Sequence, residues 1–263
     1  MRFARLLPSF VLATSLLNPT AAPQTAQNAP LAVQYLHQAL TALGGNTPLT
    51  DVALTGSAHY IAGSDDETGT ATLKAVVGAS RMDLSLSSGS YSEIQNRLSG
   101  SPIGAWSGPT GLSHPMAYHN LLTDPVWFFP AFPIAGGLSP NYVATYIGHE
   151  TRNGQTVEHV SVTQTSPAQP SPGSTLSQHL TQVDFFLDFS TLLPAAITFS
   201  THPDDNALLD IPVEVQFSNY RAVNGVQIPF HVKKYLNNSL LLDLQFQTVV
   251  LNAGLSATTF SVQ

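Results

Sequence analysis

Histidine and carboxylate side chains are the groups in this sequence that could carry acid–base or metal chemistry. The chain of 263 residues has nine histidines and 16 aspartates and glutamates, and it has no cysteine. Disulfides, thiol catalysis and cysteine-based metal sites are therefore excluded. The sequence also lacks a Gly-x-Ser-x-Gly elbow, a phosphate-binding loop, a dinucleotide fingerprint and a His-Glu-x-x-His motif. We therefore predict no enzyme activity, no catalytic residue and no cofactor.

Two of the histidines flank a dipeptide that predicts a tight turn. Asn153–Gly154 separates two runs of alternating residues, and both Asn and Gly tolerate the positive φ of a type I′ hairpin turn. In this register His149 faces Glu158 and His159 faces Gly148, so the two imidazoles lie on opposite faces of the sheet. A metal site shared by these histidines is not expected.

The stretch THPDD offers His202 beside Asp204 and Asp205. Pro and Asp are turn formers, so we interpret the stretch as a loop rather than as a metal site. A hydrolase that uses His202 with Asp204 is the alternative with the least support. Asp184 and Asp188 share one face of a predicted strand, but they lie roughly 13 Å apart on it, too far for joint acid–base work. No metal ligand is predicted.

The densest cluster of large apolar side chains lies in a proline-rich segment, 99–141. Prolines exclude a regular strand through its apolar part, so we predict an irregular or short helical insert. Trp127, Phe128, Phe129 and Phe132 belong to this insert. Two interpretations stay open: these side chains close the core as a plug, or they form a mobile lid over a lipid-sized cavity.

Strands make up most of the elements around this insert. Residues 29–45 have apolar residues at helical spacing and end in Gly-Gly, which predicts one helix. Short alternating runs then predict about ten antiparallel strands, and the Pro- and Ser-rich residues 166–175 predict a loop. A sheet of this size curls. The predicted fold class is mainly β with few helices: a large, strongly curved antiparallel sheet (an open half-barrel) covered by the N-terminal helix and the mid-chain insert.

The hairpin FSNYRAVNGVQIPFHVKKY shows the alternation most clearly. With Asn224–Gly225 as a type I′ turn, Val223 faces Val226 and Phe217 faces Val232. One face of the hairpin is then apolar and the other polar. We expect the apolar face of the whole sheet to be covered.

Charge composition argues against a nucleic-acid partner. Only 10% of the residues are charged, the net charge is −7, and the largest basic cluster is the pair Lys233–Lys234. By contrast, 43% of the residues are hydrophobic, which is enough for a sizeable core.

The first 26 residues have the pattern of a secretory signal peptide. Two arginines precede an apolar run, 6–17, that is too short to span a bilayer, and small residues follow it. We predict that 1–26 is a cleaved signal peptide and that 27–263 forms a single curved-sheet domain with the insert at 99–141. No transmembrane segment is predicted, and the mature protein is expected to be periplasmic or secreted.

The order of elements resembles the periplasmic lipoprotein-carrier (LolA-like) superfamily. The similar features are the signal peptide, an opening helix that ends in Gly44–Gly45, a long meander, an apolar mid-chain insert, the late hairpin YRAVNGVQIP, and LLLDLQFQTVVLN with Phe260 after it. The resemblance implies an open, strongly curved sheet with a helical lid that binds acyl chains inside. It transfers no individual binding residue to this sequence.

We therefore predict an exported protein that binds a hydrophobic ligand in the concave face of the sheet, as a carrier or chaperone without catalysis. The expected partner is a hydrophobic small molecule or a lipid, and a lipoprotein is a further candidate. The predicted cavity and lid residues are Trp127, Phe128, Phe129, Phe132, Phe217, Phe230, Val232, Leu242, Leu244 and Phe246. The alternative is an envelope protein-interaction or sensor module whose own side chains fill the core and whose partner is an envelope protein.

Overall fold

The computed structural model describes residues 30–262 except 46, 99, 124–125 and 166–170. The signal peptide predicted for 1–26 lies outside the described residues. The described chain forms thirteen strands, three α-helices and two 3-10 helices. Their bounds are α1 (Pro30–Leu43), β1 (Asp51–Ala62), β2 (Asp65–Val76), β3 (Ala79–Leu86), β4 (Gly89–Asn96), β5 (Ile103–Ser107), β6 (Ser113–Pro115), η1 (Tyr118–Leu121), α2 (Ala131–Gly137), β7 (Tyr142–Arg152), β8 (Gln155–Gln164), α3 (Pro172–Leu180), β9 (Val183–Asp188), β10 (Pro194–Thr201), β11 (Ile211–Val223), β12 (Val226–Leu236), β13 (Ser239–Leu251) and η2 (Ala257–Phe260). Within these ranges no helix has the length and apolar character needed to cross a membrane.

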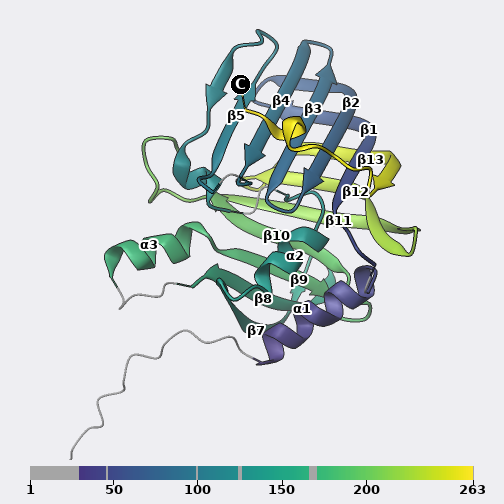
Figure 1. Cartoon of the computed structure of the whole chain (residues 1–263), viewed down its shortest axis with the longest axis vertical. Helices are drawn as coiled ribbons and strands as arrows, with labels where there is room; N and C mark the ends of the chain where they lie inside the picture. Colours follow the sequence, from purple (N-terminus) through teal and green to yellow (C-terminus); the bar gives the residue numbers. More distant parts are fainter. Residues whose placement is uncertain (1–29, 46, 99, 124–125, 166–170, 263) are drawn as a thin grey trace, which may run out of the picture.

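All thirteen strands belong to one antiparallel sheet in the order β6-β5-β4-β3-β2-β1-β13-β12-β11-β10-β9-β8-β7 (Figure 1). Neighbours in the sheet are also neighbours in the sequence except at its centre, where β1 pairs with β13. The two edge strands, β6 and β7, are joined by the segment that contains η1 and α2. The predicted antiparallel, mainly β architecture is confirmed.

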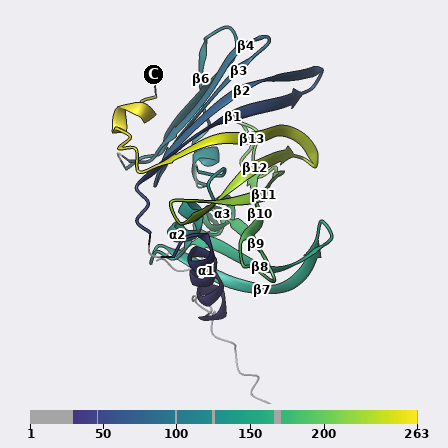
Figure 2. The same ribbon diagram turned by 90° about the vertical axis from the view of Figure 1, so that its right-hand side faces the viewer.

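The sheet is open and strongly bent, as the sequence predicts. Figure 2 shows the bend between β4 and β7, with α1 and α2 on its inner side. One cause is a bulge between β1 and β13, where the register shifts at Thr55 and Gly56. A Cβ on Gly56 would lie 2.1 Å from the carbonyl oxygen of Gln245 and 2.7 Å from Cα of Phe246. Only glycine permits the two strands to approach so closely at this point.

The two Asn-Gly turns have the predicted geometry. Asn153 and Gly154 have φ of 50° and 79°, and Asn224 and Gly225 have φ of 50° and 83°. Positive φ at both central positions is the requirement of a type I′ turn. The predicted pairs that the structure confirms are Val223 with Val226, Phe217 with Val232, His149 with Glu158 and His159 with Gly148.

The inner face of the sheet is buried under the helices. The helix predicted for 29–45 is present as α1, and it buries Ala32, Leu36 and Leu43 against α2, β7, β8 and β12. Its C-terminus is closed by the amides of Gly44 and Gly45, which both donate to the carbonyl of Leu40 at 3.1 Å. The buried side chains of the helices, of the 126–138 segment and of the inner sheet face form one continuous cluster.

The prediction of a loop at 166–175 is wrong for residues 172–175, because α3 begins at Pro172. Ser171 caps this helix: its Oγ accepts from the amide of Ser174 at 3.1 Å, and the Ser174 hydroxyl accepts from the amide of Ser171 at 2.8 Å. Proline fits the first turn of a helix, where its missing amide would have no partner anyway. A Pro-Ser-Pro sequence is therefore as compatible with a helix start as with a loop.

Candidate ligand-binding pocket

The residues 126–138, here called the aromatic segment, fold onto the inner face of the sheet. A turn places Trp127, Phe128 and Phe129 before α2, whose first turn includes Phe132 and Pro133. The rings of Trp127 and Phe128 meet edge to face with centroids 5.4 Å apart, and those of Phe129 and Phe132 do so at 4.9 Å. All four aromatic side chains are at most 3% exposed. They are part of the packed core in this structure.

A pocket of about 280 Å³ opens beside Trp127. Its walls come from β4, β5, the segment after β6, and the ends of β10, β11 and β12. Val213 and Leu236, which pair across β11 and β12, place it on the same sheet face as the core. The lining residues are Glu93, Gln95, Trp106, Met116, Ala117, Asn120, Thr123, Trp127, Phe199, Ser200, Thr201, His202, Asp204, Val213, Lys234, Leu236 and Leu241. The lining therefore combines an apolar wall with a few polar groups, as ligand pockets usually do.

Lys234 supplies the positive charge of this pocket. It lies on the apolar face of β12, opposite Val215 on β11. Its Nζ lies 4.3 Å from the centroid of the Trp127 ring, in a cation–π contact. Among the described residues Lys234 makes no ion pair, while Glu93 is engaged by the side-chain amide of Gln95 at 3.1 Å. An anionic group in the pocket would meet this ammonium next to an apolar wall.

Hydrogen bonds fix the position of η1, which forms one wall of the pocket and precedes the aromatic segment. The side-chain amide of Asn120 on η1 donates to the carbonyl of His202 at 2.7 Å, and its oxygen accepts from the amide of His202 at 2.8 Å. The Asn120 oxygen also accepts from the hydroxyl of Thr201 at 3.1 Å. On the other side, the guanidinium of Arg97 donates to the carbonyls of Leu121 and Thr123. These bonds hold η1 between β4 and the end of β10.

Solved structures with the same architecture cover nearly the whole described chain. An outer membrane lipoprotein-sorting protein domain from Vibrio parahaemolyticus is 12% identical with a TM-score of 0.55, over 89% of this chain and 97% of that chain. A LolA superfamily protein from Nitrosomonas europaea is 11% identical with a TM-score of 0.53, over 88% and 97% of the two chains. The chain has a LolA-like fold. A DUF1329 family protein from Desulfovibrio piger shares it, at 10% identity and a TM-score of 0.54 over 89% and 98% of the chains. No protein-family model matches the sequence, and no curated protein does.

Within this LolA-like fold, the ten predicted cavity and lid residues come together in one buried cluster. Of these ten, only Trp127 lines the pocket described above. Phe217 borders a separate pocket of about 180 Å³, which is otherwise lined largely by polar residues such as Gln216 and His231. The residues packed within the core are Phe128, Phe129, Phe132, Phe230, Val232, Leu242, Leu244 and Phe246.

Most of the residues that line the pocket beside Trp127 were not predicted from the sequence. Lys234 could have been predicted, because the register of the hairpin around Asn224–Gly225 already places it on the apolar face of the sheet. No sequence signal placed Met116, Asn120 or Phe199 in the pocket, because the segment after β6 meets β10 only through the curvature of the sheet.

The residues considered for acid–base or metal chemistry are mostly placed as predicted. His149 and His159 lie on opposite faces. Asp184 pairs with His159 at 3.0 Å, whereas Asp188 caps the turn after β9. Burial raises the pKa of Asp184, but hydrogen bonds from His159 and its polar neighbours outweigh that effect, so the pKa lies below its usual value. The two aspartates do not form an acid–base pair.

The stretch THPDD is a loop, as predicted, but His202 does not pair with Asp204. Its Nε2 lies 2.9 Å from Oδ1 of Asp210, at the far end of the same loop. The histidine–aspartate pair that a hydrolase would need from this stretch is therefore not formed.

Proposed function

We propose that this protein is an exported carrier that holds a lipid, or the acyl part of a lipidated protein, on the concave face of its sheet. The observation that carries the proposal is the pocket beside Trp127, which opens on the apolar face and joins an apolar wall to Lys234. The LolA-like fold supports it, because one of the solved structures that share the fold is a lipoprotein-sorting protein domain. The predicted signal peptide supports export.

The pocket has room for a head group and the first carbons of a ligand. Its volume of about 280 Å³ lies just below the range of pockets that enclose a drug-sized molecule. A longer acyl chain must take the place of side chains that now fill the core. We assign that exchange to the aromatic segment, which lies at the pocket wall and would act as the lid.

The energetics of this exchange are close to balanced. Burying a chain of about ten methylenes gains about 8 kcal/mol, and exposing a large apolar side chain costs about 1.5–3 kcal/mol. The free energy gained by burying one acyl chain therefore offsets the cost of exposing three or four aromatic side chains. Phe217, Phe230, Val232, Leu242, Leu244 and Phe246 would line the enlarged cavity. A near-balance suits a carrier, since the ligand can be both taken up and released.

Native mass spectrometry and fatty-acid binding test this proposal together. Protein purified from cells is expected to carry bound lipid, and the delipidated protein is expected to bind a fluorescent fatty acid. A Trp127→Ala variant should bind the fatty acid more tightly, because one large apolar side chain fewer has to be exposed when the acyl chain enters the core. Protein that is empty as purified and binds no fluorescent fatty acid would contradict the proposal.

The burial of all four aromatic side chains favours one second candidate: an envelope protein-interaction module with a self-filled core. In that case the aromatic segment stays in place and a protein partner contacts the outer surface. Affinity capture from an envelope extract would then recover one protein partner, while the captured complex contains no lipid and Trp127→Ala leaves the capture unchanged.

A further inference from the structure

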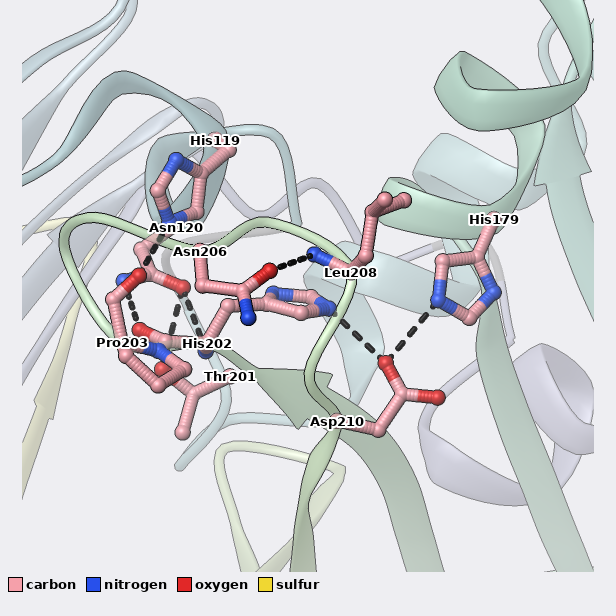
Figure 3. A network of polar contacts seen from close by, with 9 residues as sticks. All are labelled: His119, Asn120, His179, Thr201, His202, Pro203, Asn206, Leu208 and Asp210. Atoms are coloured by element: carbon pink, nitrogen blue, oxygen red, sulfur yellow. Dashed lines mark hydrogen bonds and ion pairs between the residues drawn. The ribbon is translucent and has the colours of Figure 1, made fainter. Parts of the chain in front are cut away.

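Two histidines and one aspartate meet where α3 contacts the loop 202–210: His179 comes from α3, and His202 and Asp210 come from the two ends of the loop. Asp210 Oδ1 lies 2.9 Å from Nε2 of His179 and 2.9 Å from Nε2 of His202 (Figure 3). The His202 side chain is only 1% exposed, whereas those of His179 and Asp210 are 41% and 46% exposed. One ring is thus held inside the protein, and the other two groups face it from the solvent side.

The donor set and its spacing suit a small transition-metal ion. The three ligand atoms all lie within 4.8 Å of one another. A tetrahedral ion with bonds of about 2.0–2.2 Å separates its ligand atoms by roughly 3.3–3.6 Å. The two carboxylate–imidazole distances of 2.9 Å need to lengthen by roughly 0.5 Å to reach that range. The exposed His179, near the end of α3, needs only a small side-chain adjustment to bring its Nε2 to the same distance from His202.

His202 is fixed more firmly than a loop residue usually is. Its backbone is tied to Asn120 at both the amide and the carbonyl, at 2.8 and 2.7 Å. Its ring meets the rings of His119 and His179 edge-on, with centroids 5.7 and 5.9 Å away. Metal ligands need this kind of support, because an ion binds tightly only where the ligands are already oriented.

The second ring nitrogen of His202 lies inside the protein. Nδ1 is buried and has no hydrogen-bond partner among the described residues. Nε2, which faces Asp210, is the nitrogen that an ion can reach, and a metal binds the neutral form of an imidazole.

We propose that His179, His202 and Asp210 bind one divalent ion of the zinc type, with an open position for water. Three protein ligands with one open position is an arrangement that zinc adopts in proteins. The affinity is expected to be micromolar rather than that of a structural zinc site. A metal at Nε2 shifts the ring proton of His202 to Nδ1, where it has no acceptor among the described residues. The ion would fasten α3 to the loop 202–210, which borders the ligand pocket through His202 and Asp204.

Calorimetric titration of the tag-free protein with Zn²⁺ tests this site. We expect one ion per chain. The variants His179→Ala and Asp210→Asn should raise the dissociation constant at least about tenfold, since losing even a group that only hydrogen-bonds to a ligand costs about 10–100-fold in metal affinity. His59→Ala is the matched control, because His59 pairs with Asp66 at 2.5 Å and has no third candidate ligand within the described ranges. It should bind Zn²⁺ like the unaltered protein.

A second measurement keeps the test independent of how well each variant folds. Zn²⁺ should raise the Tm of the unaltered protein and of His59→Ala, but not that of His179→Ala. His179 is exposed, so its substitution should leave the far-ultraviolet circular dichroism unchanged. Absence of saturable Zn²⁺ binding, or equal binding by the unaltered protein and His179→Ala, overturns the proposal. Neither outcome bears on lipid binding at Trp127, so this proposal and the carrier proposal fail separately.

Discussion

Lys234 brings a charge to a sheet face that is otherwise apolar. Its neighbour in sequence, Lys233, points to the opposite face and pairs with Asp243 at 3.7 Å. Two adjacent residues of the same type thus have different surroundings, one beside the Trp127 ring and one on the polar face. This pair allows the contribution of a positive charge in the pocket to be separated from the net charge of the protein.

Lys234→Gln is expected to weaken binding of a fatty-acid anion about tenfold, because a contact with a charged partner contributes about 1.5–3 kcal/mol. Lys233→Gln changes the net charge equally and should leave binding unchanged. Titration of both variants with a fluorescent fatty acid measures the difference. Equal affinities would show that Lys234 does not contact the carboxylate.

A buried carboxylate lies on the inner face beside α1. Glu158 is 3% exposed and accepts a hydrogen bond from the hydroxyl of Tyr146 at 2.5 Å. This bond, together with burial, raises the pKa of Tyr146 well above its ordinary value. The Tyr146 ring also stacks on Tyr35 of α1, with centroids 5.1 Å apart. The network connects β7, β8 and α1.

Tyr146→Phe should lower the free energy of unfolding by about 1 kcal/mol, because the buried Glu158 loses the hydrogen bond from this hydroxyl. Tyr142→Phe is the control, since Tyr142 lies on the same strand and its hydroxyl makes no hydrogen bond within the described part of the chain. Urea denaturation of both variants gives the comparison. A loss of similar size in the control would assign the effect to the tyrosine ring rather than to the hydroxyl.

Glu214 gives the protein a predictable sensitivity to acid. Burial raises the pKa of Glu214, but hydrogen bonds from Gln216, Arg152 and Asn153 outweigh that effect and hold it below its usual value. A carboxylate with a lowered pKa stabilises the folded state above its unfolded pKa. That contribution is lost as the pH falls through the folded value.

Glu214→Gln should therefore be less stable than the unaltered protein at about pH 7, and the difference should shrink toward about pH 3. Urea denaturation at a series of pH values measures it. A difference that stays constant across the series would mean that the charge of Glu214 is not responsible.

At the scale of elements, the bulge at Gly56 controls how β1 meets β13. Gly56→Ala would bring a methyl group within 2.1 Å of a backbone oxygen. We expect a loss of about 1–3 kcal/mol or more in unfolding free energy, as in other overpacked sites. Gly108→Ala is the control, because its nearest contact would be an ordinary 3.6 Å to the Tyr91 ring. Thermal denaturation of both variants checks this, and equal Tm values would contradict it.

The elements differ in how far the sequence could predict them. Asn153–Gly154 and Asn224–Gly225 determine a turn type, and the turn type determines the register of the adjoining strands. The helix start at Pro172 was missed because Pro and Ser favour loops and helix N-termini alike. In the site, Trp127 was predicted because it is large and apolar. Asp210 was not, because its meeting with His179 depends on the tertiary packing of α3.

At the scale of the whole molecule, the carrier proposal requires the aromatic segment to leave the core when an acyl chain binds. Amide hydrogen exchange should then increase in 126–138 on lipid binding. Peptides from β3 and β4 should show no change, because they pair with neighbouring strands on both sides. Mass spectrometry of peptides from the lipid-bound and lipid-free protein measures this. Unchanged exchange in the aromatic segment would contradict a lid role.

The pairing of β1 with β13 has a consequence for how the protein is made. These strands are about 190 residues apart, as the hydrogen bond between Thr55 and Thr248 illustrates with a separation of 193. Hairpins on either side can form as the ribosome delivers them, yet the two halves of the sheet remain unjoined until β13 has been synthesised. Loop closure over such a distance is slow. A nascent chain therefore stays incompletely folded, and accessible to chaperones, until β13 has emerged.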